Sequence, residues 1–434
     1  MIENDKGFWR GYWPLLLVIV AGQLAQQADV IMVGHLGGGA PGAYAMTTRL
    51  VVVDVILLSA MGAVASTAIG EARRNGASPR VIGAILWLSL LAGLCCAAFG
   101  AATYPRLAKL LVGDDAIAGL ICDGVLWYSF AAPFRFISST SAFMLHALDQ
   151  GAGVVKWKLW EFAAKAIGNF LAMEIFGLGF SSCFQIGAVI CVGSSIWGIW
   201  ALLRHGVDWL TLPGASWARR FGNAALWESE RGVAMHLAML ACLTMFAAPG
   251  LGNYDVGRLN CFAAGQTLML IVFTPLVTLM RFLAFRLAGL TDERLIDSIR
   301  TISLQGAPFA VGVAILLMAG TDALGRLYGQ HGPWWTTLVE ILAASIPLRY
   351  MTSILRAVLQ ARGSFGTVAR TDSSVFWLVA LPLVALGLYI DSPLVAYLSL
   401  IVPEGLGALR FWKQAPLVSR AARPRSGPET STAI

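Results

Sequence analysis

The sequence predicts an all-α polytopic membrane protein with twelve transmembrane helices, based on its composition, its apolar runs and an internal repeat. Of the 434 residues, 57% are hydrophobic and 13% are charged, whereas roughly 25% of residues are charged in an ordinary soluble protein. Apolar runs of about 20 residues, the helix length that crosses the hydrocarbon core of a bilayer, recur along nearly the whole chain. A transmembrane β-barrel would instead need segments of about ten residues with alternating hydrophobicity, and the sequence contains none.

The apolar runs form two sets of six on either side of a polar stretch. We expect an N-terminal six-helix bundle over residues 1–203, a cytoplasmic linker over 204–232 and a C-terminal six-helix bundle over 233–412. Residues 413–434 are rich in Ser, Pro and Arg and predict a disordered cytoplasmic tail. The predicted spans cover residues 11–33, 43–69, 81–103, 118–147, 156–177, 185–203, 233–249, 258–288, 301–319, 334–360, 373–390 and 394–411.

The distribution of Lys and Arg predicts the orientation. Most of those in the connections lie on the side of the N-terminus, which identifies that side as cytoplasmic and places both termini in the cytoplasm. We expect the membrane to be a plasma (bacterial inner) membrane. The net charge of +7 follows from this bias and requires no nucleic-acid partner. The first apolar run continues to Val33 without a small-residue cleavage site, so it predicts a retained helix. The spacing of the seven Cys matches no metal site or disulfide framework, and we expect neither metal nor cofactor.

An internal repeat relates the two halves. The segment "APFRFISST" (132–140) matches "IPLRYMTSI" (346–354), which aligns Arg135 with Arg349 and Phe136 with Tyr350. Because six spans is an even number, both halves keep the same orientation. They should therefore be related by a pseudo-two-fold axis along the membrane normal, with a central cavity between the bundles.

Asp29 interrupts the first apolar run, which carries no charge from Tyr12 to Ala28. A carboxylate facing lipid would be costly, so Asp29 should face the bundle interior or water. Removal from water favours the neutral form of a carboxylate, which suits a group that takes up and releases protons. The alternative is a helix-end Asp capped by nearby donors, before a turn in "GHLGGG".

Several motifs resemble those of the multidrug and toxic compound extrusion (MATE) transporters. They are "ADVIMVGHLG" (28–37), "IGEARRNGASPRVIG" (69–83), "IFGLGF" (175–180) and "FWLVALPLVALGL" (376–388). The resemblance implies a secondary antiporter, not an enzyme, that exports a small organic molecule while protons or sodium ions enter. The substrate would be a drug, metabolite or siderophore, and we expect a monomer.

The resemblance also implies that Asp29 is the cation-coupling group. Relatives carry helper residues at positions that correspond here to Ile167 and Leu171, and the polar residues nearby are Asn169 and Glu174. The lost oxygen ligands favour protons over sodium. Asp54, in the interior of the predicted helix 43–69, is either a second coupling carboxylate or a structural partner of Arg49.

Arg135 and Arg349 are the most unusual residues, because each lies deep in a predicted span and follows a Pro that would open its helix. We expect the two arginines to face each other across the cavity and to bind an anionic group of the substrate, bidentately if it is a carboxylate or phosphate. Tyr128, Phe136 and Tyr350 share their helices and should line the same cavity.

Internal pairing is the alternative for these charges, and interhelix packing is the alternative for the aromatic residues. Arg135 would pair with Glu161, Glu174 or Asp54, and Arg349 would pair with Glu340. Lys165 lies four residues after Glu161, a spacing that favours an ion pair within one helix.

Other functions fit the sequence less well. A flippase for a lipid-linked sugar would also have a basic cavity, but such proteins often have fourteen spans. A membrane enzyme would need a metal or nucleotide motif, and the sequence has neither H-E-x-x-H nor G-x-x-x-x-G-K-[ST]. A channel is less consistent with two repeats that carry an acidic site on one side only.

Overall fold

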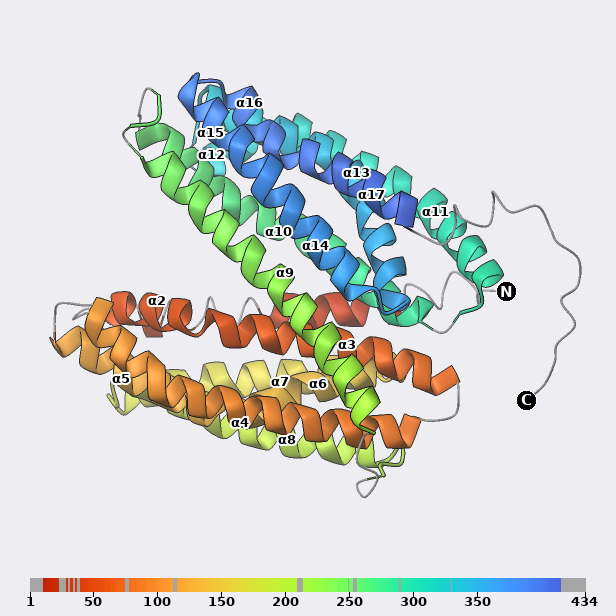
Figure 1. Ribbon diagram of the computed structural model, residues 1–434. Coiled ribbons are helices and arrows are strands. Elements are labelled where there is room, and N and C mark those ends of the chain that lie inside the picture. The colour runs from red at the N-terminus through yellow and green to blue at the C-terminus, as the bar shows by residue number, and fades with distance from the viewer. Residues whose placement is uncertain are drawn as a thin grey trace, which may run out of the picture. The chain divides into compact units, whose positions relative to one another are not determined.

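Helices make up the regular structure of the residues that the computed structural model describes (Figure 1). Within these residues, eight helices are long and apolar enough to cross a membrane, or nine when one bent pair counts as a single span. The all-helical, multi-pass class is confirmed, and the number of twelve spans stays a prediction. The described residues are 11–22, 29, 32–33, 36, 40–74, 78–111, 115–208, 214–248, 250–252, 256–288, 290–328 and 330–414.

Some predictions concern residues outside this description. They include most of the sequence "GHLGGG" and the part of the predicted tail beyond Gln414, as well as residues 23–28 and 30–31 of the first predicted span.

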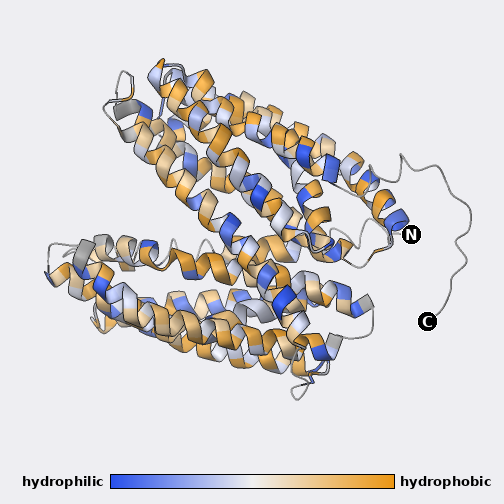
Figure 2. Cartoon of the chain, viewed as in Figure 1, coloured by the Kyte–Doolittle hydropathy of each residue, from blue (hydrophilic) through white to orange (hydrophobic). Residues whose placement is uncertain are grey.

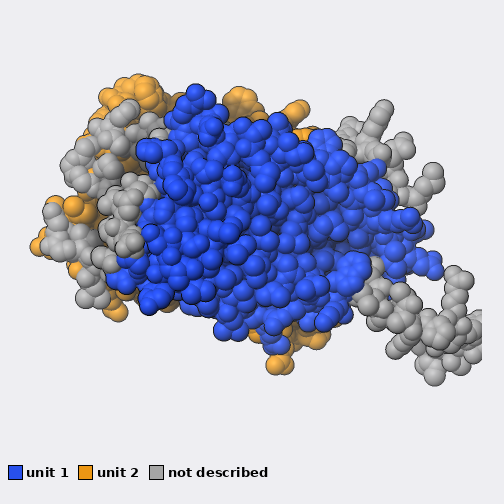
Figure 3. Space-filling model, turned by 90° about the horizontal axis from the view of Figure 1, so that it is seen from above, with its two compact units in different colours: residues 1–2, 234–434 blue, residues 3–233 orange. Residues whose placement is uncertain are grey.

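The chain divides into two compact units, coloured separately in Figure 3. In the described residues, the N-terminal unit extends to Val233 and the C-terminal unit begins at Ala234. Part of the predicted linker is helical, because residues 215–232 belong to α9 (Ala215–Ala247), which continues into the C-terminal unit.

The N-terminal unit is built around one central helix. Its described elements are a helix over Gly11–Gly22, α2 (Ala40–Leu50), α3 (Val52–Arg74), α4 (Ser78–Leu111), α5 (Asp115–Phe130), α6 (Ala132–Ala147), α7 (Gly151–Phe170), a π-helical turn (Leu171–Ile175), α8 (Ser181–Leu203) and the first part of α9. The central helix is α6, which packs against α3, α4 and α8. Small residues allow this close approach: a Cβ added at Gly93 of α4 would lie only 2.5 Å from the Cα atom of Pro133.

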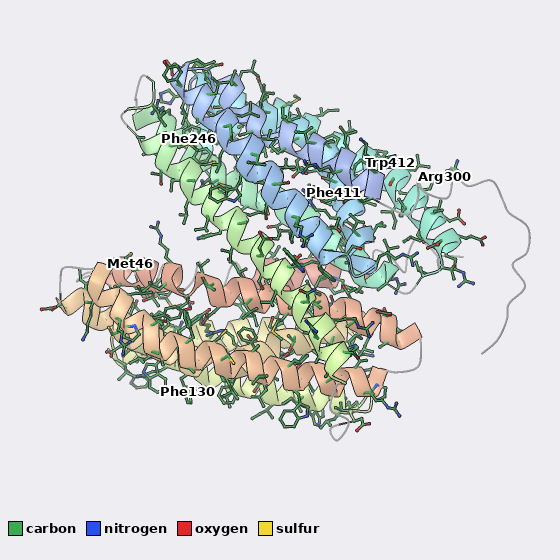
Figure 4. The ribbon with its side chains drawn as sticks, viewed as in Figure 1. Met46, Phe130, Phe246, Arg300, Phe411 and Trp412 are labelled. Atoms are coloured by element: carbon green, nitrogen blue, oxygen red, sulfur yellow. The ribbon has the colours of Figure 1, made fainter. Side chains whose placement is uncertain are left out.

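The C-terminal unit has the same kind of centre. After α9 its described elements are α10 (Val256–Leu287), α11 (Asp292–Ala319), α12 (Thr321–Tyr328), α13 (Pro333–Ala361), α14 (Phe365–Val375), a π-helical turn (Phe376–Ala380), α15 (Leu381–Tyr389), α16 (Pro393–Tyr397), a 3-10 turn (Leu398–Leu400) and α17 (Val402–Gln414). The central helix is α13, which packs against α10, α11 and α17. Phe246, labelled on α9 in Figure 4, stacks on Phe262 with ring centroids 4.0 Å apart.

The internal repeat is visible in these elements. The repeat segments lie on α6 and α13, the central helices of the two units. These helices end at equivalent residues, Ala147 and Ala361, and each is followed after three residues by the next helix. The two turns contain equivalent residues with positive φ, 63° at Asp149 and 75° at Gly363.

Two predicted spans are interrupted in the N-terminal unit. The span predicted over 118–147 consists of α5 and α6, which meet at Ala131 with a bend of 52°. Pro133 explains part of this break, because it cannot donate the backbone hydrogen bond that a continuous helix would require. The span predicted over 43–69 is divided at Val51, so Asp54 lies in the first turn of α3 rather than in a helix interior. By contrast, α13 continues through Pro347.

Both units expose many large apolar side chains, and hydrophobic residues extend along the helices of both units (Figure 2). Trp160 is 76% exposed, Leu316 is 72% exposed and Leu378 is 74% exposed. Extensive apolar exposure is unusual in a soluble monomer and agrees with contact between these helices and lipid.

Candidate functional site

Asp29 lies in a buried polar site of the N-terminal unit. The residue is 3% exposed. Lys165 forms an ion pair with Oδ2 of Asp29. The Nδ2 of Asn169 donates a hydrogen bond to Oδ1 over 2.9 Å, and the hydroxyl of Tyr44 donates to Oδ2 over 3.2 Å. Three donors from α2 and α7 therefore surround one carboxylate, and the prediction that Asp29 faces the interior agrees with this burial.

Lys165 does not pair with Glu161 as predicted, and the local charges explain why. Glu161 instead pairs with Lys158, three residues earlier, at 2.7 Å, and accepts a hydrogen bond from Ser194. The side chain of Asp29 is 4% exposed and that of Glu161 is 25% exposed. The more deeply buried carboxylate gains more from a cation, because little water remains to solvate it.

The polar residues predicted near Asp29 have different positions. Asn169 is fully buried and contacts Asp29 directly. Glu174 lies on the π-helical turn after α7 and is exposed. Lys165 and Tyr44 are the contacts that the sequence interpretation missed. An intramembrane Lys four residues before Asn169, on the same helix face, was the available signal.

Asp54 forms a second buried acidic site in the same unit. It is 2% exposed, and Tyr104 of α4 donates a hydrogen bond to Oδ1 over 2.8 Å. The other carboxylate oxygen, Oδ2, is buried with no partner among the described residues. Tyr104 was not predicted as a partner, and Arg49, which was, is exposed.

Arg135 lies in the first turn of α6, directly after the break. Its guanidinium group stacks on the ring of Tyr128 at 3.4 Å from the centroid, and Nη1 donates to the Tyr128 carbonyl over 3.0 Å. Nη2 is buried without a partner, and Arg135 forms no ion pair within 4.0 Å in the described part of the chain. The predicted pairing with Glu161, Glu174 or Asp54 is therefore wrong at ion-pair distance, although the charge of Asp54 is close enough to interact.

Arg349 belongs instead to a cluster of four charges in the C-terminal unit. It pairs with Glu404 at 3.0 Å, not with Glu340, which is exposed. Its guanidinium also lies over the ring of Phe273, 4.0 Å from the centroid. Glu404 is bound as well by Arg356 at 3.1 Å.

Arg356 connects the rest of this cluster. Its Nε and Nη2 atoms contact Asp372 at 2.9–3.1 Å, a bidentate arrangement. Thr352 donates a hydrogen bond to Glu404 over 2.8 Å. Two arginines thus neutralise two carboxylates. The small pocket beside them, of about 10 Å³, has room for about one water molecule, so it is too small for an organic substrate.

The aromatic residues predicted to line a cavity differ among themselves. Tyr128 is partly exposed and supports Arg135. Phe136 is fully buried in the core, so the prediction that it lines a cavity is wrong for this structure. Tyr350 is 6% exposed and donates to the Ile302 carbonyl over 2.6 Å, which favours packing between α13 and α11 over contact with a cavity.

Sequence comparison relates the N-terminal part of the chain to one family. The MatE family model matches residues 14–158, a segment that contains Asp29, Asp54 and Arg135 and ends before Lys165. A comparison with curated proteins found no match. In the described residues, no three His, Cys, Asp or Glu side chains form a group that could hold a metal ion.

Solved structures of transporters share the fold of nearly the whole chain. A MOP superfamily transporter from Pyrococcus furiosus, described by a binding pocket of reverse polarity that suggests a different function, is 13% identical, with a TM-score of 0.82 over 96% of both chains. An outward-facing multidrug resistance MATE transporter is 13% identical, with a TM-score of 0.82 over 96% of this chain and 97% of that one. A MATE protein in a bent conformation is 13% identical, with a TM-score of 0.84 over 96% of both chains.

At this level of identity the solved structures establish the fold, and the family model supplies the link in sequence. Residues 14–158 match the MatE model and the chain as a whole has the fold of MATE transporters. A family-model match over residues 14–158 and a shared fold thus relate the protein to the MATE transporters.

Proposed function

We propose that the protein is a secondary antiporter of the bacterial inner membrane that exports a small organic molecule while protons enter. It would work by alternating access of two six-helix bundles, twelve helices in all, as a monomer with both termini in the cytoplasm. The family and the fold support transport. The buried pair of Asp29 and Lys165 supports coupling to ions, because a charged pair inside a membrane protein usually serves the transport pathway.

The guanidinium group of Arg135, which has no ion pair in the described part of the chain, is the observation that supports an anionic group on the substrate. A guanidinium group favours bidentate contact with a carboxylate or phosphate. Arg135 has an unpartnered, buried Nη2 and no ion pair in the described part of the chain. Because a partly buried charge without an anionic partner is costly, a bound anion would stabilise it. The reverse polarity described for the similar Pyrococcus furiosus transporter indicates that pocket charge varies among proteins of this fold.

Arg349 no longer supports an anion site. Glu404 already occupies its guanidinium group, and Arg356 and Asp372 balance the rest of the cluster. The proposed contacts to substrate are therefore Arg135 and Tyr128, and the role of Arg349 is structural.

The sign of the substrate charge has a consequence for coupling. Arg135 stacks on Tyr128 and Lys165 pairs with Asp29, so both cations belong to the N-terminal unit. A proton on Asp29 would release the Lys165 ammonium and strengthen binding of an anion there. Direct linkage would thus make protons and an anion bind together in one conformation. Antiport therefore requires the proton to bind in the conformation that opens to one side and the anion to bind in the conformation that opens to the other side. A cationic substrate would instead compete with protons for Asp29 directly.

A ligand-stabilisation screen on the purified protein tests this proposal. The compounds are organic cations, carboxylate-rich anions and lipid-linked sugars, and the variants are Arg135→Ala and its repeat counterpart Arg349→Ala. We expect anions to raise the melting temperature of the wild type and of Arg349→Ala but not of Arg135→Ala.

Other results of this screen would indicate a different class of substrate. Stabilisation by organic cations that does not depend on Arg135 would indicate a cation exporter. Stabilisation by lipid-linked sugars alone would indicate a flippase. Transport into liposomes driven by a pH gradient, with the compound that stabilises best, then tests antiport itself.

A further inference from the structure

The surroundings of Asp29 are those of a cation site whose cation is attached to the protein. The ammonium group of Lys165 contacts Oδ2 of Asp29, where a free cation would bind. It reaches there from α7, and its side chain is 27% exposed while that of Asp29 is 4% exposed. The other groups around the carboxylate are the neutral side chains of Tyr44, Asn169 and Cys183. Lys165 therefore supplies the one positive charge that Asp29 needs.

An attached cation excludes free ones. A metal ion would have to displace a group that is held beside the carboxylate at a high effective concentration. It would also bring a second positive charge next to the ammonium group, which is unfavourable where little water screens it.

The rest of the site could still supply oxygen ligands if the Asn169 amide turned its oxygen towards Asp29. Oδ1 of Asn169 is buried and has no hydrogen-bond partner in the described part of the chain, although Nδ2 of the same amide contacts Asp29. The Tyr44 hydroxyl and both Asp29 oxygens lie at the same place. Hard cations in proteins are bound by carboxylate, amide and hydroxyl oxygens of this kind.

We propose that Lys165 is a built-in counter-ion that closes the Asp29 site to sodium and other metal cations, and that removing it opens the site to them. The inference rests on the proposed role of Asp29 as the coupling group and deepens it. It makes Lys165 the residue that determines ion specificity, leaving the proton as the ion that Asp29 can exchange.

The test measures cation binding by the purified protein and requires no transport substrate. The melting temperatures of the wild type and of Lys165→Met are compared in sodium chloride and in choline chloride at equal ionic strength. Lys158→Met is the matched control, because it removes a lysine from the same helix and also leaves a carboxylate, Glu161, without its ion pair. Lys165→Gln, which retains a polar side chain, replaces Lys165→Met if the latter does not fold.

We expect sodium to stabilise Lys165→Met by a few °C, saturably, because a ligand that binds only the folded state raises its melting temperature. The wild type, Lys158→Met and the double variant Asp29→Asn with Lys165→Met should not respond. A sodium-specific rise in the wild type, or none in either folded Lys165 variant, would overturn the proposal.

A transport measurement separates this inference from the proposed function. If Lys165→Met binds sodium through Asp29 but Asp29→Asn transports normally, the ion site exists and the proposal that it couples transport is wrong. If proton-driven transport requires Asp29 but the wild type also binds sodium, the coupling role stands and the exclusion by Lys165 is wrong.

Discussion

Arg135 and Arg349 occupy equivalent positions of the internal repeat, yet the two units treat them differently. Arg135 stacks on Tyr128 and leaves a guanidinium nitrogen without a partner, whereas Arg349 pairs with Glu404 in a neutral cluster of four charges. The same register aligns Lys158 with Asp372, so the sign of the charge on the following helix is reversed. The comparison teaches that a repeat preserves the place of a charge but not its partners.

The difference extends to the ion site. The N-terminal unit holds Asp29 with Lys165. Upstream of the central helices the repeat aligns "AYAMTTRL" (43–50) with "FAAGQTLM" (262–269), and this register extrapolates from Asp29 to about Ala248, which carries no charge. We therefore assign coupling and substrate binding to the N-terminal unit. The charged cluster of the C-terminal unit would stabilise that unit.

The largest effect expected from this assignment is the loss of coupling in Asp29→Asn. The asparagine cannot carry a proton, so transport driven by a pH gradient into liposomes should be abolished while folded protein remains in the membrane. Undiminished transport by this variant would remove Asp29 from the mechanism.

Asp54→Asn is the matched control for this measurement. Asp54 is another buried carboxylate of the same unit, and its contact with the Tyr104 hydroxyl can be retained by the asparagine oxygen. We expect coupling to survive this change if Asp54 is structural. Equal loss of coupling in both variants would make Asp54 the second coupling carboxylate.

A large effect on stability is expected in the C-terminal unit. Arg356→Met removes the cation that contacts both Asp372 and Glu404, whose side chains are 4% and 6% exposed. Removing one partner from a buried charged pair costs about 3–5 kcal/mol. We expect a loss of this size in the free energy of unfolding, measured in detergent.

Arg349→Met should be less destabilising than Arg356→Met. In this variant Glu404 keeps Arg356 and the Thr352 hydroxyl as partners, so the carboxylate is not left alone. A larger loss in Arg349→Met than in Arg356→Met would contradict the view that Arg356 connects the cluster.

The sequence predicted local features, such as helices, better than contacts between residues that lie far apart in the chain. The apolar runs and the repeat predicted helices and the deep positions of Asp29, Arg135 and Arg349. The partners were harder to predict. Lys165 lies 136 residues from Asp29 in sequence, and spacing within one helix suggested Glu161 instead. The choice depended on relative burial, which only the packing of α7 against neighbouring elements determines.

Helix breaks were missed for a related physical reason. The apolar pattern continues through Val51 and Ala131, so the hydropathy of these segments predicts uninterrupted spans. Pro133 indicated a weak point, but its counterpart Pro347 lies within a continuous helix. A Pro thus permits a break, and the packing around the helix decides whether it occurs.

The smallest effect is expected for the stability of Arg135→Met, and it is the sharpest test of the comparison. The change removes a cation–π contact worth about 1–2 kcal/mol and one hydrogen bond to a backbone carbonyl, but it also removes a partly buried charge that lacks an anionic partner. These contributions oppose each other, so the free energy of unfolding should stay within about 1 kcal/mol of the wild-type value.

The same variant should lose the stabilisation by carboxylate-rich anions that the wild type shows. A structural arginine would give the opposite pattern, with reduced stability and unchanged ligand response, as expected for Arg349→Met. If Arg135→Met is destabilised as much as Arg356→Met, Arg135 has a structural ion pair within the folded protein. The two arginines would then differ in their partners and not in their function.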